Sequence, residues 1–380
     1  MEPIQLFVPT FHVDEVLSEI RECLEKGWTG LGFKTVQFEE AWRNYTGLKN
    51  AHFVNSATAG LHLAVRLLKE AGNWKQGDEV ISTPLTFVST NHVLLYEGLR
   101  PVFADVDEYL CLDPDAVLPQ ITPRTRAVMF VGLGGNVGQL PRVADLCRRN
   151  NLKLILDASH MAGTRYYGGH VGGEADVSVF SFQAVKNLPT ADSGMVCFSD
   201  AELDREARKW SWLGIGKDTY ARTVEKEGTY RWYYDVEHVG FKYNGNSIMA
   251  AIALVQLRYL DRDNTYRRQI AAWYDEFLED DPRVGRVPVA PGCESARHLY
   301  QVLVENRDQV MAQMNEEKVF PGVHYRDNTV YRMYRYAAGT CPKAARASDC
   351  LISLPVHLRL TRYDVARVAS CLQRALGQCI

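Results

Sequence analysis

Two residues of this chain have the chemistry and the position to serve a carbonyl cofactor. Lys186 follows the β-rich run 175–181, and Asp157 stands at the carboxyl end of a second apolar run, 152–156. A lysine amine can form an imine with the aldehyde of pyridoxal phosphate (PLP), and a carboxylate can keep the pyridine nitrogen protonated. Because any α/β protein has lysines and aspartates near strand ends, this pair alone is a weak indication.

A cofactor phosphate needs a site of its own, and residues 52–60 offer one. This stretch runs from a short strand into an apolar helix, with the small residues Ser56, Ala57 and Thr58 at the junction. Backbone N–H groups at a helix N-terminus favour anions, so these residues are candidates to hold a phosphate. The simpler interpretation is an N-cap, in which Asn55 or Ser56 satisfies the free amides and binds nothing. Taken alone, the pattern favours the cap.

Composition limits the kinds of protein that this chain can be. It has 380 residues, a formal net charge of -3 and nine cysteines, none of them in a C-x-x-C pair. This charge gives no reason to expect a nucleic acid or an anionic membrane as a partner. No apolar run is long enough to cross a bilayer, and no basic region precedes a hydrophobic segment at the start. We therefore expect a cytoplasmic protein with reduced thiols and no bound metal.

Strand and helix patterns alternate through the first two thirds of the chain. Continuous apolar runs are typical of parallel strands that are covered on both faces. Such runs occur at 79–82, 101–106, 127–131, 152–156, 175–181 and 194–198. Helical patterns occupy 57–70, about 142–150 and about 247–278. Together these patterns predict an α/β domain.

The end of the chain has a different pattern. A strand-like run at 298–304 precedes a helix from Arg307, and a closing helix begins with Thr361 and Asp364 in the spacing of a capping box. A smaller α+β domain is therefore expected. We place the two domains at residues 1–260 and 261–380.

Seven short motifs follow one another along almost the whole chain. They occupy 27–32, 55–62, 77–87, 157–160, 181–188, 240–257 and, as a late pair, 298–300 with 354–357. Their content and order resemble the DegT/DnrJ/EryC1/StrS family of PLP-dependent sugar aminotransferases. Each motif is common by itself, but seven in the right order argue against coincidence.

The resemblance implies both a fold and an assembly. The fold would be that of a fold-type I PLP-dependent transferase, similar to aspartate aminotransferase. It has a mostly parallel seven-stranded sheet and a smaller α+β C-terminal domain. The resemblance also implies a homodimer with shared active sites, in which Asn244 reaches the cofactor phosphate of the neighbouring subunit.

The resemblance also implies roles for individual residues. Lys186 would carry the cofactor as a Schiff base and move the proton that leads to pyridoxamine 5'-phosphate. Asp157 would pair with the ring nitrogen, His160 would lie near the phenolic oxygen, and Phe87 would stack on the ring. The full implied cofactor-binding set is Ser56, Ala57, Thr58, Phe87, Asp157, His160, Ser181 and Asn244.

Several positions depart from the family pattern. Gln183 stands where many relatives have histidine, Ala57 replaces a glycine, and 191–194 differs from the usual Gly-Glu-Gly-Gly type of sequence. These changes leave the lysine and Asp157 in place, but they put the identity of the substrate in doubt. One branch of the family has histidine at the lysine position and removes a hydroxyl group. Because this chain keeps Lys186, transamination is favoured.

The implied reaction moves an amino group from L-glutamate (or glutamine) to a keto group of a nucleotide-linked deoxy sugar. The product would serve a surface polysaccharide, such as a lipopolysaccharide O-antigen, or a glycosylated natural product. Candidate substrate contacts are Thr29, Lys242, His324 and Tyr325. The aromatic run 230–234 fits a sugar-nucleotide contact and a dimer interface equally well.

Two alternatives stay open from the sequence. The first keeps the enzyme class but replaces the substrate with a cyclitol or another carbohydrate ketone that has no nucleotide. The second is a regulatory protein with a PLP fold and no catalytic activity. The presence of both Lys186 and Asp157, without a basic recognition helix, speaks against the second.

Overall fold

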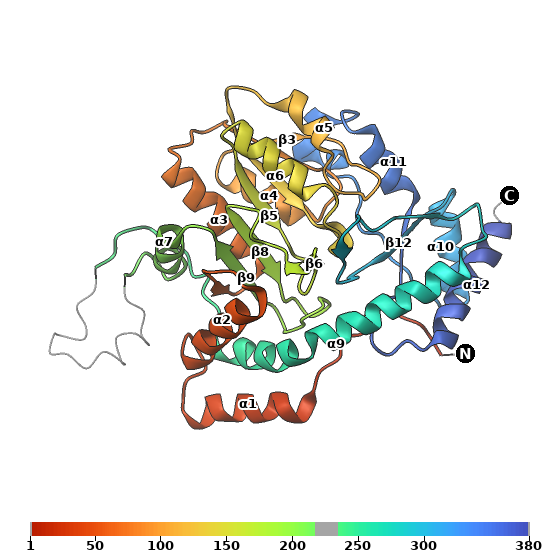
Figure 1. The fold of residues 1–380 in the computed structure, drawn as a ribbon, viewed down its shortest axis with the longest axis horizontal. Helices are drawn as coiled ribbons and strands as arrows, with labels where there is room; N and C mark the ends of the chain where they lie inside the picture. The colour runs from red at the N-terminus through yellow and green to blue at the C-terminus, as the bar shows by residue number, and fades with distance from the viewer. Residues whose placement is uncertain (1, 217–234, 379–380) are drawn as a thin grey trace.

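The computed structural model describes residues 2–216 and 235–378. A sheet of seven strands forms the centre of the fold, and Figure 1 shows helices packed around it. Its strands, in spatial order, are β1 (His52–Val54), β9 (Gly194–Phe198), β8 (Val177–Ser181), β5 (Lys153–Asp157), β4 (Thr125–Val131), β2 (Glu79–Ser82) and β3 (Arg100–Phe103). The pairs from β8 to β3 are parallel, whereas β9 pairs antiparallel with both β8 and β1. The predicted mostly parallel seven-stranded sheet is confirmed.

α-Helices, short 3₁₀ helices and two smaller sheets complete the described elements. The helices are α1 (Val13–Glu25), α2 (Phe33–Thr46), α3 (Ala57–Ala71), α4 (Val88–Tyr96), α5 (Pro114–Val117), α6 (Leu140–Arg149), α7 (Ala201–Ser211), α9 (Ser247–Phe277), α10 (Arg307–Glu316), α11 (Pro342–Cys350) and α12 (Arg362–Gln378). One small sheet joins β10 (Gly285–Arg286), β12 (Tyr300–Leu303) and β13 (Leu351–Leu354), and the other joins β11 (Cys293–Glu294), β6 (Arg165–Tyr166) and β7 (Gly169–His170).

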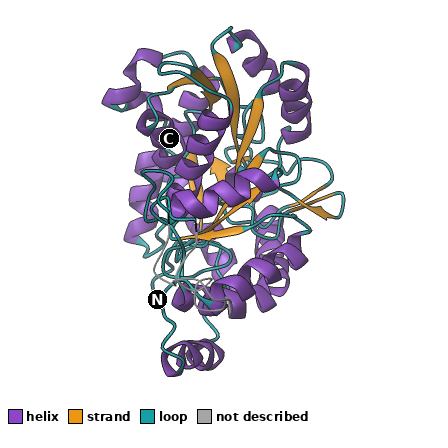
Figure 2. Cartoon of the chain, turned by 90° about the vertical axis from the view of Figure 1, so that its left-hand side faces the viewer, coloured by secondary structure: helices purple, strands orange, loops and turns teal. Residues whose placement is uncertain are grey.

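Helices cover both faces of the central sheet (Figure 2). Side chains along each strand point alternately to the two faces, so each strand contributes to two cores. On β4, Val128 and Phe130 enter a core that they share with α2, α6 and the first half of α9. Ala127 and Met129 enter a second core that they share with α3, α4 and α7. Burial on both faces explains why these strands have continuous apolar sequences.

The C-terminal part of the chain has a third core. It lies between β12, β13, α10, α12 and the second half of α9, which contributes Ile270. Ile4 from the N-terminal segment also enters this core, and α9 runs without a break across residues 260 and 261. The division into domains 1–260 and 261–380 stays a prediction.

The start of α12 follows the expected capping pattern. The backbone N–H of Thr361 donates to Asp364 Oδ2 at 2.8 Å, and the N–H of Asp364 donates back to Thr361 Oγ1 at 3.3 Å. The predicted capping box is therefore present. At the start of α9, Asn246 Oδ1 accepts the N–H of Met249 at 2.9 Å.

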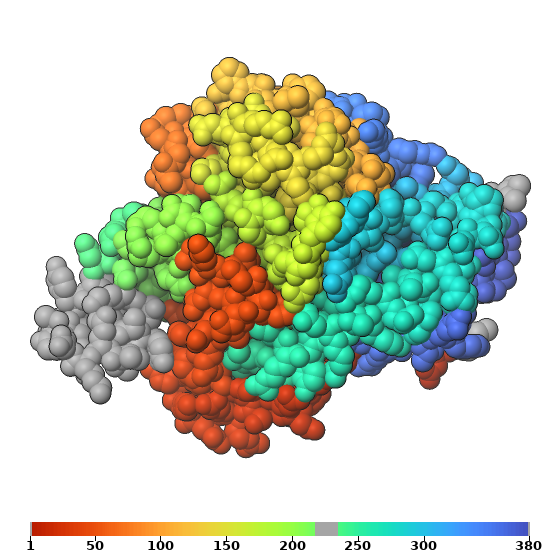
Figure 3. All heavy atoms as spheres, in the orientation of Figure 1, coloured from red at the N-terminus to blue at the C-terminus, as the bar shows by residue number. Residues whose placement is uncertain are grey.

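The N-terminal helices pack along α9. Both α1 and α2 contact this long helix, and the space-filling view shows the red N-terminal residues against the teal α9 (Figure 3). The predicted aromatic run 230–234 lies outside the described residues. Across 2–216 and 235–378, no helix combines the length and the apolar character needed to cross a bilayer.

The carboxyl edge of the central sheet brings the candidate residues together. β5 ends at Asp157 and β8 ends at Ser181, while α3 begins after Ser56 and α4 begins after Phe87. Parallel strands share one carboxyl edge, so the loops that follow them meet in space. The fold therefore positions a site at this edge.

Candidate functional site

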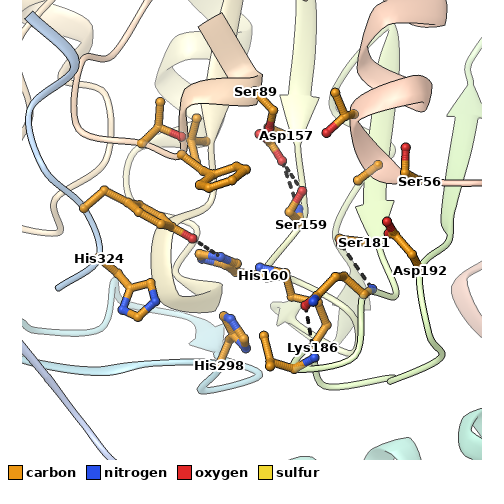
Figure 4. A pocket seen from close by; sticks show the side chains of 18 of the residues that line it. Ser56, Ser89, Asp157, Ser159, His160, Ser181, Lys186, Asp192, His298 and His324 are labelled. Atoms are coloured by element: carbon orange, nitrogen blue, oxygen red, sulfur yellow. Dashed lines mark hydrogen bonds between the residues drawn. The ribbon is translucent and has the colours of Figure 1, made fainter. Parts of the chain in front are cut away.

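A cavity of about 480 Å³ lies at the carboxyl edge of the sheet and collects most of the predicted site residues (Figure 4). Its lining includes the predicted Ser56, Ala57, Thr58, Phe87, Asp157, His160, Ser181, Lys186, His324 and Tyr325. These residues come from segments that are far apart in the sequence. The fold alone makes them neighbours.

Lys186 lies in the loop that follows β8, and its side chain points into the cavity (Figure 4). The loop turns at this residue, since the Lys186 N–H donates to the Gln183 carbonyl oxygen at 2.8 Å. Burial lowers the pKa of Lys186 to about 8, although the Asp157 carboxylate favours the charged form. Such an amine is partly neutral near pH 7, as a nucleophile or proton carrier needs to be.

Asp157 is a buried carboxylate at the end of β5 whose two oxygens are both held in place. Oδ1 accepts the N–H of Ser159 at 3.1 Å and its hydroxyl at 2.6 Å. Oδ2 accepts the Thr90 hydroxyl at 2.7 Å, and Thr90 Oγ1 lies 3.0 Å from Thr86 Oγ1. The carboxylate therefore keeps one orientation and can still accept a further N–H from the cavity.

The N-terminus of α3 offers unused donors to the cavity. Ser56 caps the helix, because its Oγ accepts the N–H of Ala59 at 3.1 Å. Among the described residues, the N–H groups of Ala57 and Thr58 have no hydrogen-bond partner. Ser181 Oγ, which accepts only a long bond of 3.4 Å from the Gln183 N–H, lies on the same cavity wall. The cap and an anion site are therefore both available at this helix end.

A glycine keeps this helix end close to the sheet. A Cβ atom at Gly194, the first residue of β9, would come within 2.9 Å of the Ala57 nitrogen and 2.8 Å of the Phe180 carbonyl oxygen. No side chain fits that space. Gly194 thus allows the helix N-terminus to sit directly beside the ends of β8 and β9.

His160 is held between a backbone amide and a tyrosine. Its Nδ1 accepts the N–H of Gly134 at 3.2 Å, so the proton of the neutral ring is on Nε2 and points to Tyr325 Oη at 3.1 Å. Burial, followed by the positive charge of Lys186, holds the pKa of His160 well below its usual range. His160 is therefore a neutral donor to Tyr325.

Phe87 and His324 form further parts of the cavity wall. Phe87 is 56% exposed, and its ring centroid lies 5.9 Å from that of Tyr325. An aromatic ring that is left this open, at the mouth of a cavity, is available to stack on a planar ligand. His324 Nδ1 lies 3.0 Å from Ser353 Oγ, and burial lowers the pKa of His324 to about 4.

Three predicted residues lie outside this cavity. Thr29 is exposed in the loop before α2. Lys242 Nζ lies 3.1 Å from the centroid of the Trp212 ring and donates to Asn244 Oδ1 at 3.0 Å. The segment with Lys242 and Asn244 nevertheless borders the start of α3, since the N–H of Asn55 donates to the Tyr243 carbonyl oxygen at 2.8 Å. A role for these three residues stays a prediction.

Several lining residues are absent from the predicted set. They are Phe7, Thr86, Ser89, Val131, Ser159, Gln183, Val185, Asp192 and His298. Ser159 and Gln183 lie inside the motifs 157–160 and 181–188, so the sequence could have indicated that they line the site. Phe7 had no such signal, and neither had Thr90, which does not line the cavity but donates its hydroxyl to Asp157 Oδ2. Within the described ranges, no three His, Cys, Asp or Glu side chains are placed to hold a metal.

Comparison of the sequence with known protein families agrees with a PLP site in this cavity. Residues 12–373 match the DegT/DnrJ/EryC1/StrS aminotransferase family. The chain belongs to this family. A relative from Methanocaldococcus jannaschii, the uncharacterized protein MJ1066, is 32% identical over 98% of each chain.

Solved structures of other proteins have the same fold. The aminotransferase TlmJ from Streptoalloteichus hindustanus is similar with a TM-score of 0.91 and 31% identity, covering 100% of both chains. The PLP form of the putative sugar aminotransferase Spr1654 from Streptococcus pneumoniae has a TM-score of 0.91 and 26% identity, also over 100% of both chains. The chain is thus a fold-type I, PLP-dependent aminotransferase, and the predicted family, fold, enzyme class and cofactor are confirmed.

The cavity of this aminotransferase fits its cofactor. Free amides and hydroxyls, a fixed carboxylate and the amine of Lys186 all line this one cavity. A phosphate, a pyridine nitrogen and an aldehyde need groups of these three kinds.

Thr90→Val tests the support of the Asp157 carboxylate. Valine keeps the shape of threonine but lacks the hydroxyl that donates to Asp157 Oδ2, so a buried acceptor loses its partner. The free energy of unfolding of the cofactor-free protein should fall by about 1–3 kcal/mol, and PLP should bind more weakly. Urea unfolding and absorbance titration measure the two effects. Thr90→Ser keeps the hydroxyl and should stay near the wild type; equal behaviour of the two variants would contradict this role.

Proposed function

We propose that this aminotransferase moves an amino group from L-glutamate (or glutamine) to a keto group of a nucleotide-linked deoxy sugar. The product would be an amino sugar for a surface polysaccharide or a glycosylated natural product. The observation that carries the proposal is the convergence of Lys186 and Asp157 in one cavity. The similarity to a putative sugar aminotransferase supports the substrate class.

Lys186 would be the reacting amine. Bound PLP supplies a ring that accepts the electron pair released when the α-hydrogen of an amino acid leaves as a proton. Lys186 Nζ holds the cofactor and, once free, takes up that proton and returns it. The lowered pKa of Lys186, about 8, allows Nζ to act in both directions near neutral pH. Asp157 would accept the N–H of the ring nitrogen and would stabilise its charged form.

The remaining cavity residues would position the cofactor. Ser56, Ser181 and the free amides of Ala57 and Thr58 would bind the phosphate, next to the helix N-terminus. Phe87 would cover one face of the ring. In the same arrangement His160 would lie beside the phenolic oxygen.

The charges of the cavity support a shared active site. Among the described residues that line it, Lys186 is the only lysine or arginine. A phosphate and the two carboxylates of glutamate would add several negative charges, so further donors must come from outside. We infer a homodimer in which Lys242 and Asn244 of one chain complete the cavity of the other. Thr29, His324 and Tyr325 would contact the sugar.

The state of the cysteines agrees with a cytoplasmic enzyme. Every cysteine in the described part of the chain is a free thiol. The thiols of Cys111 and Cys197 are buried, and burial raises the pKa of each, so they are protonated and unreactive.

A substrate screen tests the proposed reaction. Enzyme preloaded with pyridoxamine phosphate should aminate a ketosugar linked to dTDP, UDP or GDP, and mass spectrometry should detect the product. The same nucleotide sugars should raise the unfolding temperature, because they bind only the folded state. Amination of a cyclitol ketone, without any response to nucleotide sugars, would instead identify the second substrate class.

Borohydride labelling tests the role of Lys186. Reduction of the purified, PLP-loaded enzyme should fix a pyridoxyl group on this lysine, and peptide mapping should locate it. Lys186→Ala should still bind cofactor through the phosphate site but lose turnover by at least about 10³-fold, because one group both holds the cofactor and moves the proton. A label on any other lysine would overturn the assignment.

Mixing of inactive variants tests the shared site. After subunit exchange, Lys186→Ala and an Asn244→Ala variant should form a heterodimer in which one of the two sites has both residues. Activity should partly return. Lys186→Ala mixed with Asp157→Asn is the matched control, since both residues line the same chain's cavity and no complete site can form. Verified exchange without recovery in the first mixture would refute the shared site.

A further inference from the structure

Gln183 lines the same cavity as Lys186, but the proposed function gives it no role. It lies in the loop that follows β8, between Ser181 and Lys186, which both line the cavity (Figure 4). It is also one of the positions at which this chain departs from the family pattern, since many relatives have histidine there. A residue that differs in this way and lines the cavity is a candidate to contact what the cavity binds.

The side-chain amide of Gln183 has one fixed orientation. Its Oε1 accepts the backbone N–H of Val185 at 3.1 Å. A backbone N–H can only donate, so the amide oxygen must lie on this side and the NH2 group on the other. The N–H of Gln183 donates to Ser181 Oγ at 3.4 Å, and its carbonyl oxygen accepts the N–H of Lys186 at 2.8 Å. The loop therefore holds both the backbone and the side chain of this residue.

The NH2 group of Gln183 is free to donate. Among the described residues Nε2 has no hydrogen-bond partner, and it is not one of the unbonded polar atoms that are sealed from solvent. Its two N–H bonds are available at any pH near neutrality, because an amide does not titrate there. Gln183 thus offers a neutral donor whose direction is already set.

The chain itself supplies no acceptor for this donor. Asp157 and Asp192 are the two acidic residues that line the cavity. Asp157 accepts its hydrogen bonds from Thr90 and Ser159, and no carboxylate of the described residues accepts one from Gln183. A molecule with phosphate or carboxylate oxygens would bring an acceptor, and hydrogen bonds to such charged oxygens are stronger than those between neutral groups.

We propose that Gln183 is a binding residue whose Nε2 donates a hydrogen bond to an anionic oxygen of a molecule bound in this cavity. Two molecules can bring this oxygen, because PLP has a phosphate and the amino donor has a carboxylate. The phosphate source rests on the cofactor alone, whereas the carboxylate source rests also on the proposed function. The bond adds a donor without adding charge, so it does not replace the positive charges that a partner subunit would bring.

Two substitutions remove this donor in different ways. Gln183→Glu keeps an oxygen for the N–H of Val185 and replaces the NH2 group with a second oxygen. Gln183→Met keeps a side chain of similar length, adds no charge and removes both polar atoms. A lost contact within the loop would affect only Gln183→Met, and a general repulsion of anions would affect only Gln183→Glu. Loss of the proposed donor affects both variants.

Two measurements distinguish the sources of the oxygen. One is the affinity of the cofactor-free enzyme for PLP, followed by absorbance. The other is KM for L-glutamate or glutamine in the half-reaction that gives pyridoxamine 5'-phosphate, which needs no sugar. If the phosphate is the acceptor, both variants should bind PLP about ten- to a hundredfold more weakly. If the carboxylate is the acceptor, PLP affinity should stay at the wild-type value and KM should rise by a similar factor in both variants. Thermal unfolding checks that each variant is folded.

Three results would overturn the proposal. Wild-type PLP affinity and KM in both variants would show that Nε2 bonds neither anion. An effect of Gln183→Met alone would leave Gln183 with only the support of its own loop, and an effect of Gln183→Glu alone would show repulsion without a bond. If the wild type accepts neither amino donor, the proposed function fails, and the PLP titration alone decides the role of Gln183.

Discussion

The site depends on the hydrogen bonds that hold the buried carboxylate of Asp157. A carboxylate with almost no exposed surface is costly to bury unless hydrogen bonds compensate the lost water. Thr90 and Ser159 supply three such bonds. The position of the residue is set independently by the sheet, where it pairs with Val131 on β4 and Val179 on β8. The backbone and the hydrogen-bond donors together fix the position of this carboxylate. The other groups of the cavity are arranged around it.

The charge of Asp157 opposes the effect of burial on the protonation of Lys186. Burial favours the neutral amine and Asp157 favours the ammonium, and the pKa of Lys186 that results is about 8. The histidines nearby do not disturb this balance, since burial keeps the pKa values of His160, His298 and His324 low and leaves all three rings uncharged. Polar groups therefore surround the lysine without adding positive charge. Such an environment keeps one amine available in both protonation states, as proton transfer in two directions requires.

The sequence predicted the fold, and it singled out most residues that the structure brings together in one cavity, because both depend on local signals. Continuous apolar runs identified the covered strands, and short motifs identified Lys186 and Asp157. What it could not predict were partners from distant segments. Thr90 is 67 positions from Asp157 and is a buried helix residue with no distinguishing neighbours, and Asn187 meets Asn264 only through the packing of α9. Tautomers and hydrogen-bond directions are properties of such contacts, so no single segment of sequence contains them.

The start of α3 shows why two interpretations of one motif need not compete. From the sequence, a helix cap and a phosphate site were alternatives, and the cap was the simpler of the two. In the structure the Ser56 hydroxyl accepts the N–H of Ala59, which lies deeper in the helix. The amides of Ala57 and Thr58, two residues that line the cavity, have no hydrogen-bond partner among the described residues. A helix has more free N–H groups at its start than one side chain can satisfy. The cap fixes the first turn, and the amides that it leaves unused remain available to an anion.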